Sequence, residues 1–259
     1  MTTSRSFDRA ADYYDQTRDL PEPVATYGIP ALLKFIAPHG KILDVGTGTG
    51  RISVPLLRLG ADVIGVDLSL NMMAKLRQKY AAPRLAQADA SRLPFRSQQF
   101  DAVLTMHVMH LVAPWREALR EYRRVLRPQG VYIDSTQWHD QTSPLRRIRD
   151  QWHQLIEAQG AQWRRPGAQN PDEINAELQT LSAQVEEVEV LRYYSSGTPR
   201  EALDQIHSRV CSDAWDVPDE VFEATFKEIT AWTKKEFKHL DEPISTERRF
   251  VLRITRFLS

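Results

Sequence analysis

The chain has 259 residues, of which 42 % are hydrophobic, so it can form one large α/β domain with an inserted cap, or at most two small domains. Lysine plus arginine and aspartate plus glutamate each total 34, which leaves no bulk positive field to hold nucleic acid or an anionic membrane. The single cysteine, Cys211, excludes an intrachain disulfide and a cysteine-based zinc site. The N-terminus lacks the apolar run of a signal peptide, and no stretch reaches the length of a membrane span. We therefore expect a cytoplasmic protein, monomeric or homodimeric, without a metal, a membrane or a nucleic acid as partner.

The first forty residues predict two helical segments before any strand. Residues 1–20 are polar and aromatic and allow a short helix around residues 10–14. Residues 24–37 predict a longer helix, which Pro38, His39 and Gly40 end.

Residues 41–67 predict a strand, a glycine-rich turn, a helix from about Gly50 and a second strand. The turn alternates two residue types: Gly46, Thr47, Gly48, Thr49 and Gly50. Glycine lets a ligand approach the backbone closely, and helix N-terminal N–H groups point at whatever lies over the turn. The second strand ends in Asp67, and an acidic side chain at that position can bind both hydroxyls of a ribose. The stretch therefore predicts a site for a nucleoside with a polar tail.

Two classes of nucleoside-binding protein compete for this stretch. Dinucleotide dehydrogenases use G-x-G-x-x-G, whereas this turn is G-x-G-x-G with Asp44 two places before it. A carboxylate there suits a ligand tail that carries an ammonium group better than a pyrophosphate. The run from Asp44 to Gly50 resembles the first motif of class I S-adenosylmethionine-dependent methyltransferases of the small-molecule type, and the resemblance continues through Asp67. It implies S-adenosylmethionine as cofactor, held in part by Asp44, Gly46, Thr47, Gly48, Gly50 and Asp67.

The resemblance also implies residues for the adenine ring. The family pattern D-x-S-x-x-M is present from Asp67 to Met72, which places Leu68 along one face of the adenine and Met72 at another edge. Core packing against the sheet is an equally good reading of Met72. A third strand over residues 84–88 ends in Asp89, whose carboxylate accepts the adenine amino group in the family, while the Ala90 N–H faces a ring nitrogen.

The N-terminal segment resembles the Y-D-x-x-R pattern of many small-molecule methyltransferases. In the family this segment folds over the mouth of the cofactor site, so Tyr14 would cover the ligand and Arg18 would pair with its carboxylate. The alternative reading is a frayed N-terminal helix with a surface arginine.

The candidate catalytic residues follow the fourth strand, predicted over residues 102–106. His107 and His110 come after this strand, at the sheet edge where open α/β proteins bind ligands. Either histidine could act as general base or orient a nucleophile, and His107 is also a candidate for cofactor contact. The competing interpretation is that each histidine caps a helix or bonds to the backbone.

The complete pattern predicts a Rossmann-like α/β fold with a doubly wound, seven-stranded, mostly parallel sheet and helical lid insertions near the C-terminal strand ends. Residues 1–140 would hold an N-terminal cap helix and the cofactor-binding core, residues 141–183 a first lid, and residues 184–259 the last strands with a second lid at 198–242. We expect these parts to form one structural domain. The remaining elements are predicted at 115–126, 131–135, 144–159, 172–183, 184–194, 199–211, 218–240 and 250–254.

The pattern favours a methyltransferase that acts on a small molecule and leaves the acceptor open. An RNA or protein methyltransferase is the first alternative, supported only by the arginine clusters at 146–149 and 164–165. A protein that binds the cofactor without catalysis would carry the same motifs, and a dehydrogenase is a remote fourth reading. A general base is required only where the acceptor holds a proton that must leave.

Overall fold

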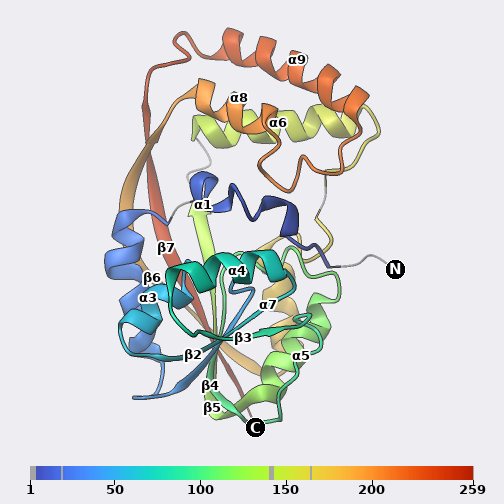
Figure 1. Cartoon of the computed structure of the whole chain (residues 1–259). Coiled ribbons are helices and arrows are strands. Elements are labelled where there is room, and N and C mark those ends of the chain that lie inside the picture. The colour runs from blue at the N-terminus through green and yellow to red at the C-terminus, as the bar shows by residue number, and fades with distance from the viewer. Residues whose placement is uncertain (1–3, 19, 140–142, 164, 259) are drawn as a thin grey trace. The chain divides into compact units, whose positions relative to one another are not determined.

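The computed structural model describes residues 4–18, 20–139, 143–163 and 165–258, with the backbone alone at 136–139 (Figure 1). The chain divides into two compact units. The first unit comprises Met1–Thr136, Pro166–Leu191 and Phe250–Ser259, and the second comprises Gln137–Arg165 and Arg192–Arg249. Three boundaries between the units fall within the long strands β5, β6 and β7 described next, and the fourth, between Arg165 and Pro166, lies outside any helix or strand.

A seven-stranded sheet organises the chain and confirms the predicted fold class. Its strands are β1 Lys41–Val45, β2 Asp62–Asp67, β3 Arg84–Gln87, β4 Phe100–Thr105, β5 Leu126–His139, β6 Ala183–Gly197 and β7 Ile244–Phe257. They lie in the order β3-β2-β1-β4-β5-β7-β6, and the pairs β1–β2, β1–β4, β2–β3 and β4–β5 are parallel. The strand order reverses between β1 and β4: β2 and β3 lie on one side of β1, and β4 and β5 lie on the other. Ligands of open α/β sheets bind beside such a reversal, at the carboxyl ends of the strands.

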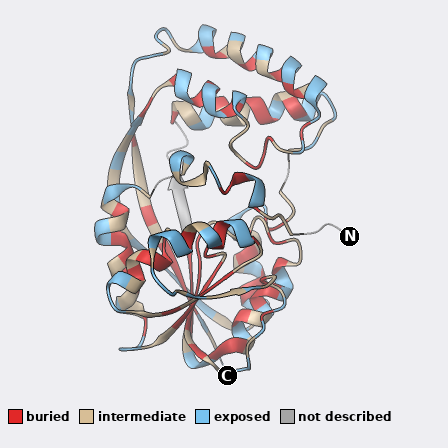
Figure 2. Ribbon diagram, in the orientation of Figure 1, coloured by how far each residue is buried: buried red, intermediate tan, exposed pale blue. Residues whose placement is uncertain are grey.

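Two helices cover one face of the sheet, and the alternation of side chains along the strands explains why. Leu43 and Val45 of β1 point into a cluster with residues of α5 (Trp115–Val125) and α7 (Pro171–Thr180), while Ile42 and Asp44 point to the opposite face. The buried residues of the sheet stand out in Figure 2. Because strands β1 and β4 are buried on both faces, most of their residues are apolar.

The helices beside the cofactor motif fit their predictions except at one start. Helix α4 runs Leu70–Lys79, and the hydroxyl of its N-cap residue Ser69 accepts the Met72 N–H at 3.0 Å. Helix α3 runs Ser53–Arg58, three residues later than predicted. Gly50 has a φ of +85°, a left-handed conformation that no α-helix can include, so the turn extends through this glycine.

The N-terminal third of the first unit is helical in short pieces. The elements are η1 Asp8–Ala10, α1 Tyr14–Thr17, η2 Val24–Gly28, α2 Ile29–Leu32 and η3 Leu33–Phe35. The single helix predicted over residues 24–37 is therefore a run of three tightly joined segments. Pro30 lies in the first turn of α2, directly after η2, and has no N–H to bond to a carbonyl of the preceding segment.

Helix α7 falls in a different unit from the rest of the predicted lid at 141–183. Ile174 and Leu178 are buried in the core cluster of the first unit. Glu177 adds polar contacts to α5, since it lies 3.2 Å from Arg116 Nε and 3.0 Å from Arg120 Nη2. Residues 166–183 thus pack with the cofactor motif, and only residues up to 165 of that predicted segment belong to the second unit.

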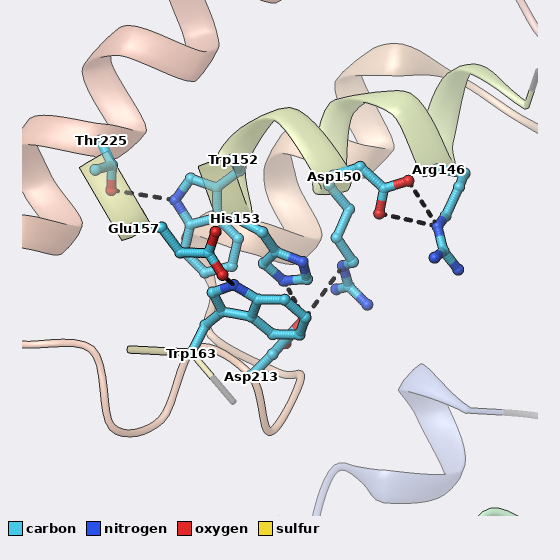
Figure 3. Close-up of polar contacts among 9 residues, drawn as sticks. Arg146, Asp150, Trp152, His153, Glu157, Trp163, Asp213 and Thr225 are labelled. Carbon is cyan, nitrogen blue, oxygen red and sulfur yellow. Dashed lines mark hydrogen bonds and ion pairs between the residues drawn. The ribbon is translucent and has the colours of Figure 1, made fainter. Parts of the chain in front are cut away.

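The second unit is built on α6 (Pro144–Ala158), α8 (Pro199–His207) and α9 (Asp219–Glu236) around fully buried Trp152 and Ile229. Figure 3 shows a polar cluster beside Trp152. His153 lies 2.9 Å from Asp213 and stacks on Trp163 with ring centroids 3.6 Å apart. Trp152 and Trp163 therefore take part in packing within this unit.

Candidate functional site

The glycine turn after β1 is shaped by contacts with β2. The backbone N–H groups of Gly46 and Thr47 both donate to the Val66 carbonyl, at 2.7 and 3.0 Å. Gly46 has a φ of +75°, and a Cβ at this position would lie 2.3 Å from Cγ2 of Val108. The residue at position 46 must therefore be glycine for two independent reasons, its backbone conformation and the close approach of the loop after β4.

Asp67 at the end of β2 fixes the same turn from the other side. Its Oδ2 accepts the Gly48 N–H and its Oδ1 accepts the Ser69 N–H, each at 2.8 Å. Burial raises the pKa of Asp67 although these donors favour its charged form. The carboxylate is thus held rigidly at the strand tip, in the orientation that hydroxyl donors of a ligand could share.

Asp89 holds the corresponding place after β3. The backbone N–H and the hydroxyl of Ser91 donate to its Oδ1 at 2.8 and 2.7 Å. Burial opposes ionisation of Asp89, but the donors from Ser91, the nearby hydroxyl of Ser4 and the charge of Arg92 together hold the pKa of this carboxyl below its usual value. Two ordered hydrogen-bond acceptors, Asp67 and Asp89, therefore stand at the ends of neighbouring strands.

The N-terminal segment, residues 4–18, is bound to the elements around the turn. Asp8 accepts the Ser69 hydroxyl at 2.6 Å. Asp15 accepts the Thr49 hydroxyl at 2.6 Å and forms an ion pair with Lys79 at 2.6 Å. The sequence alone left a frayed helix as an alternative for this segment, and these contacts place it against the glycine turn instead.

Aromatic and guanidinium groups of this segment stack on one another. Phe7 and Tyr14 meet edge to face with centroids 5.9 Å apart, and the Arg18 guanidinium lies 5.4 Å and 5.5 Å from their two ring centroids. The Arg18 carbonyl also accepts a bond from Arg51 at 2.6 Å. Tyr14 and Arg18 therefore lie together in one stacked group with Phe7.

The loop after β4 carries both candidate histidines and is held on two sides. His107 has a φ of +61°, a left-handed conformation that is uncommon for a residue with a Cβ. The His110 and Met109 carbonyls accept the Gly167 and Ala168 N–H groups at 3.0 and 3.1 Å.

The Leu111 carbonyl of this loop accepts the Arg5 N–H at 2.9 Å. The loop over residues 107–112, called the histidine loop below, is thereby fixed between the N-terminal segment and residues 167–168. Both histidines are consequently held at the carboxyl end of β4, the sheet edge at which the sequence placed them.

One pocket in the first unit brings most of the predicted residues together. Those that line it are Tyr14, Arg18, Gly46, Gly48, Asp67, Leu68, Met72, Asp89, Ala90, His107 and His110. The pocket is also lined by Ser4, Arg5, Phe7, Val45, Val66, Ala88, Met106, Val108, Leu111 and Val112. It lies at the carboxyl ends of β1, β2, β3 and β4, which is where the reversal of strand order predicts a ligand site.

A family model described as a methyltransferase domain matches residues 43–133, from the middle of β1 to β5. Residues 43–133 form a class I methyltransferase domain. The matched range contains the glycine turn, Asp67, Asp89 and the histidine loop. The N-terminal segment and the whole second unit lie outside it.

The names of two relatives that match this chain give different substrates. The chain is 32 % identical over 148 residues to a malonyl-[acyl-carrier protein] O-methyltransferase of Enterobacter lignolyticus, covering 56 % of this chain and 57 % of that protein. It is 32 % identical over 146 residues to a demethylmenaquinone methyltransferase of Streptomyces avermitilis, covering 55 % and 63 %. The chain thus spans about three fifths of the length of these curated relatives.

Solved structures extend the similarity of fold beyond the methyltransferase domain. The YcgJ protein of Bacillus subtilis superposes with a TM-score of 0.58 at 17 % identity, covering 89 % of this chain and 98 % of that one. An S-adenosylmethionine-dependent methyltransferase of Thermotoga maritima superposes with a TM-score of 0.53 at 18 % identity, covering 96 % and 98 %. At these identities the match is one of fold.

Three residues predicted to touch the cofactor do not line the pocket of the methyltransferase domain: Asp44, Thr47 and Gly50. Asp44 is buried beneath the turn and accepts the Ser53 hydroxyl at 2.5 Å, and Ser53 also bonds to the Thr47 hydroxyl at 2.7 Å. A Cβ on Gly50 would lie 2.7 Å from side chains of Leu76 and Val54. These residues shape the turn from behind.

Asp44 gives the methyltransferase domain a pH-dependent stability. Burial raises the pKa of this carboxyl to about 6, against the hydrogen bonds from Ser53 and Thr47. Between pH 4 and 6 the folded state therefore retains a proton that the unfolded state releases, so stability falls as the pH rises through this window. A raised pKa of this size corresponds to about 3 kcal/mol lost by pH 7.

Replacing Asp44 by asparagine should remove this dependence. We expect wild type to lose stability relative to Asp44→Asn between pH 4.5 and 7.5, with the variant the more stable of the two at the higher pH. Urea unfolding of both proteins without cofactor, at several pH values, measures the difference. A difference in unfolding free energy that stays constant over this range would contradict the assignment.

The sequence reasoning missed several residues that line or support the pocket. Arg5 and Phe7 line it, although no motif marks them. Gly167 supports the histidine loop so closely that a Cβ would lie 2.1 Å from the Met109 carbonyl oxygen. A glycine between Pro166 and Ala168 gives no signal of this contact, because its partner lies far away in the sequence.

The described part of the chain contains neither a membrane-spanning helix nor a cluster of metal ligands. Among its helices, none combines the length and the apolar character needed to cross a membrane. Nor do the described residues bring three His, Cys, Asp or Glu side chains together in a group that could hold a metal ion.

Proposed function

We propose that the protein transfers a methyl group from S-adenosylmethionine to a small-molecule acceptor. The observation that carries the proposal is the pocket at the reversal of strand order, with Asp67 and Asp89 at successive strand ends beside a glycine turn. The residues around it suit the cofactor chemically. Carboxylates accept hydrogen bonds from the ribose hydroxyls and the adenine amino group, and a guanidinium donates to a carboxylate.

The chain's own residues would divide the binding of the cofactor among them. Asp67 would hold the ribose, Asp89 the adenine amino group, and Leu68 with Met72 the faces of the ring. Tyr14 and Arg18 would hold the end that carries the carboxylate. Bound S-adenosylmethionine supplies a methyl group on a positively charged sulfur, so alignment of the acceptor and exclusion of water contribute much of the rate.

The histidine loop offers the candidates for proton transfer. His107 and His110 line the pocket, and the bonds to the loop backbone from Arg5, Gly167 and Ala168 limit its movement. A base acts only when the acceptor carries a proton that must leave, so the role of these histidines depends on the acceptor.

Charge in the second unit gives little support to an RNA substrate. Arg146 pairs with Asp150 at 2.8 Å, and Arg147 pairs with Glu236. Arg149 lies 3.5 Å from buried Asp213. Because these three arginines each have an acidic partner, the cluster is a weak footprint for a phosphate backbone.

Calorimetric titration of the purified chain with S-adenosylhomocysteine, with NAD as the control ligand, tests the proposal. We expect micromolar binding of S-adenosylhomocysteine and none of NAD. Asp67→Asn should weaken this binding about 100-fold, since two hydrogen bonds to a charged acceptor contribute roughly 1.5–3 kcal/mol each. Asp89→Asn should weaken it about 10-fold, because one such bond is changed.

Asp62→Asn is the matched control, because Asp62 lies at the opposite end of β2 and pairs with Arg84 outside the pocket. Its affinity for S-adenosylhomocysteine should equal that of wild type. Binding of NAD without binding of the nucleoside would overturn the proposal. Binding of the nucleoside with no turnover of any acceptor would favour the reading as a non-catalytic binding protein.

A further inference from the structure

A buried serine hydroxyl belongs to the wall of the pocket beside the end of β3. Ser4 lines the pocket together with Asp89, and the chain is held there by the Arg5 N–H, which bonds to the Leu111 carbonyl at 2.9 Å. Among the described residues that line the pocket, Ser4 alone has a buried side-chain oxygen or nitrogen without a hydrogen bond. A buried hydroxyl without a partner costs free energy, and a polar group of a ligand in this pocket would remove that cost.

Asp89 has one carboxylate oxygen to offer the same ligand. The proposed function, on which this inference rests, gives Asp89 to the amino group of adenine. Its Oδ1 already accepts the backbone N–H and the hydroxyl of Ser91, at 2.8 and 2.7 Å. No hydrogen bond from a described residue reaches Oδ2. Asp89 therefore has Oδ2 for the first of the two amino hydrogens.

The Ser4 hydroxyl lies near this carboxylate. It is one of the groups that lower the pKa of the Asp89 carboxyl, as a donor close to a negative charge does. A hydroxyl can donate and accept, and beside a carboxylate its proton turns toward the charge. The lone pairs of the Ser4 oxygen are then left for a donor of the ligand.

We propose that Ser4 binds the adenine amino group together with Asp89, so that each amino hydrogen has its own acceptor. The amino group of adenine is a donor with two hydrogens. Asp89 accepts one, and without Ser4 the other would lose its bond to water on entering the pocket. Ser4 belongs to the N-terminal segment, outside the matched residues 43–133. The base is therefore recognised partly from outside the methyltransferase domain.

Two acceptors at one position select an amino group against an oxo group. In hypoxanthine, the deaminated base, an oxygen acceptor replaces the amino group and would face the Asp89 carboxylate and the Ser4 lone pairs. Hypoxanthine also has a hydrogen on the neighbouring ring nitrogen, where the family resemblance places the Ala90 N–H, which is a donor as well. Polar groups left unpaired in this way are the means by which a hydrogen-bonding site rejects an analogue.

Calorimetry with two ligands that differ only at the amino group tests the inference. The ligands are S-adenosylhomocysteine and its 6-deamino analogue, in which purine replaces adenine. We expect Ser4→Ala to weaken the binding of S-adenosylhomocysteine about 5-fold, the usual contribution of one neutral hydrogen bond. The same variant should bind the 6-deamino analogue as wild type does, because that ligand has no amino hydrogen for Ser4 to accept.

A third ligand, S-inosylhomocysteine, carries hypoxanthine and tests the selection of the base. Wild type should bind it about 100-fold more weakly than S-adenosylhomocysteine, since two polar contacts are mismatched. Ser4→Ala should narrow this ratio about 5-fold or more.

Ser6→Ala is the matched control, since Ser6 lies in the same segment, donates to Asp8 at 2.7 Å and does not line the pocket. It should bind all three ligands as wild type does. An equal loss of S-adenosylhomocysteine and of the 6-deamino analogue in Ser4→Ala would overturn the inference, because the serine would then act only on the shape of the wall. Unchanged binding of both ligands in Ser4→Ala would overturn it as well.

The titration of wild type with S-adenosylhomocysteine comes first, so the two proposals fail separately. Absence of its binding would overturn the proposed function itself. Its binding, with an affinity that Ser4→Ala leaves unchanged, would overturn only the role of Ser4.

Discussion

Replacing Gly46 by alanine is expected to reduce the affinity for S-adenosylhomocysteine at least 100-fold. The new Cβ would lie 2.3 Å from Cγ2 of Val108, on a backbone with a φ of +75°. Either the glycine turn or the histidine loop must then move, and both line the pocket. One methyl group therefore displaces a wall of the site, which explains the size of the expected effect.

Gly60 provides a control that separates the steric clash with Val108 from the strain of a positive φ. Its φ of +81° resembles that of Gly46, but no atom lies within 4 Å of a Cβ placed there. Gly60→Ala should therefore cost only about 1 kcal/mol of stability, the typical strain of a left-handed residue, and leave the binding of S-adenosylhomocysteine intact.

The double variant Gly46→Ala with Val108→Ala removes the clash, and we expect it to recover part of the affinity. Calorimetry gives the affinities and urea unfolding the stabilities. An affinity of Gly46→Ala within threefold of wild type would contradict the close approach of the two loops.

Replacing Arg253 by methionine is expected to lower the free energy of unfolding by about 3–5 kcal/mol, as when one partner of a buried ion pair is removed. Arg253 of β7 and Asp134 of β5 expose 1 % and 7 % of their side chains. The Arg253 Nε donates to Asp134 Oδ1 at 2.8 Å, and Nη2 donates to Oδ2. Without Arg253, the carboxyl of Asp134 would remain buried beside an uncharged side chain.

The same guanidinium also joins helix α7 to the sheet. Its Nη1 donates to Asn175 Oδ1 at 2.9 Å and to the Pro171 carbonyl at 3.2 Å. Loss of Arg253 should therefore loosen α7 together with β7, and hydrogen exchange of the α7 amides measures this. The double variant Arg253→Met with Asp134→Leu should recover much of the stability, because no charge is then left buried.

Arg84→Met is the control for Arg253, since the Arg84–Asp62 pair is about half exposed and such pairs contribute at most about 1 kcal/mol. Denaturant unfolding of the four proteins gives the comparison. A loss in Arg253→Met no larger than that in Arg84→Met would refute the importance of the buried pair.

The parts of the site that the sequence predicted are those encoded within a few neighbouring residues. The glycine turn and Asp67 belong to one strand–turn–helix–strand stretch, and Asp89 follows the next strand. The pattern of apolar residues predicts strands that alternate with helices. Such strands run parallel, so their carboxyl ends meet at one edge of the sheet. This local logic also gave the order and type of most helices and strands.

The parts that it did not predict depend on contacts between distant segments. Arg5 meets the loop at Leu111, and Gly167 meets it at His110, across separations that no local pattern encodes. Burial of Ile174 and Leu178 likewise draws α7 into the first unit. The position of Asp44 behind the turn follows from its side of β1, since alternate residues of a strand face opposite ways.

The N-terminal segment has a consequence for how the activity of such a protein can change over time. The contacts we propose for the nucleoside come mainly from residues 43–133, whereas Arg5 and Phe7 come from a short stretch outside that range. The N-terminal segment is joined to the rest mainly through the side chains of its aspartates, as at Asp8 and Asp15, and through the Arg5 N–H. A few substitutions among residues 5–7 would therefore change one wall of the pocket and leave residues 43–133 as they are, so this wall can vary during evolution at little cost to the core of the first unit.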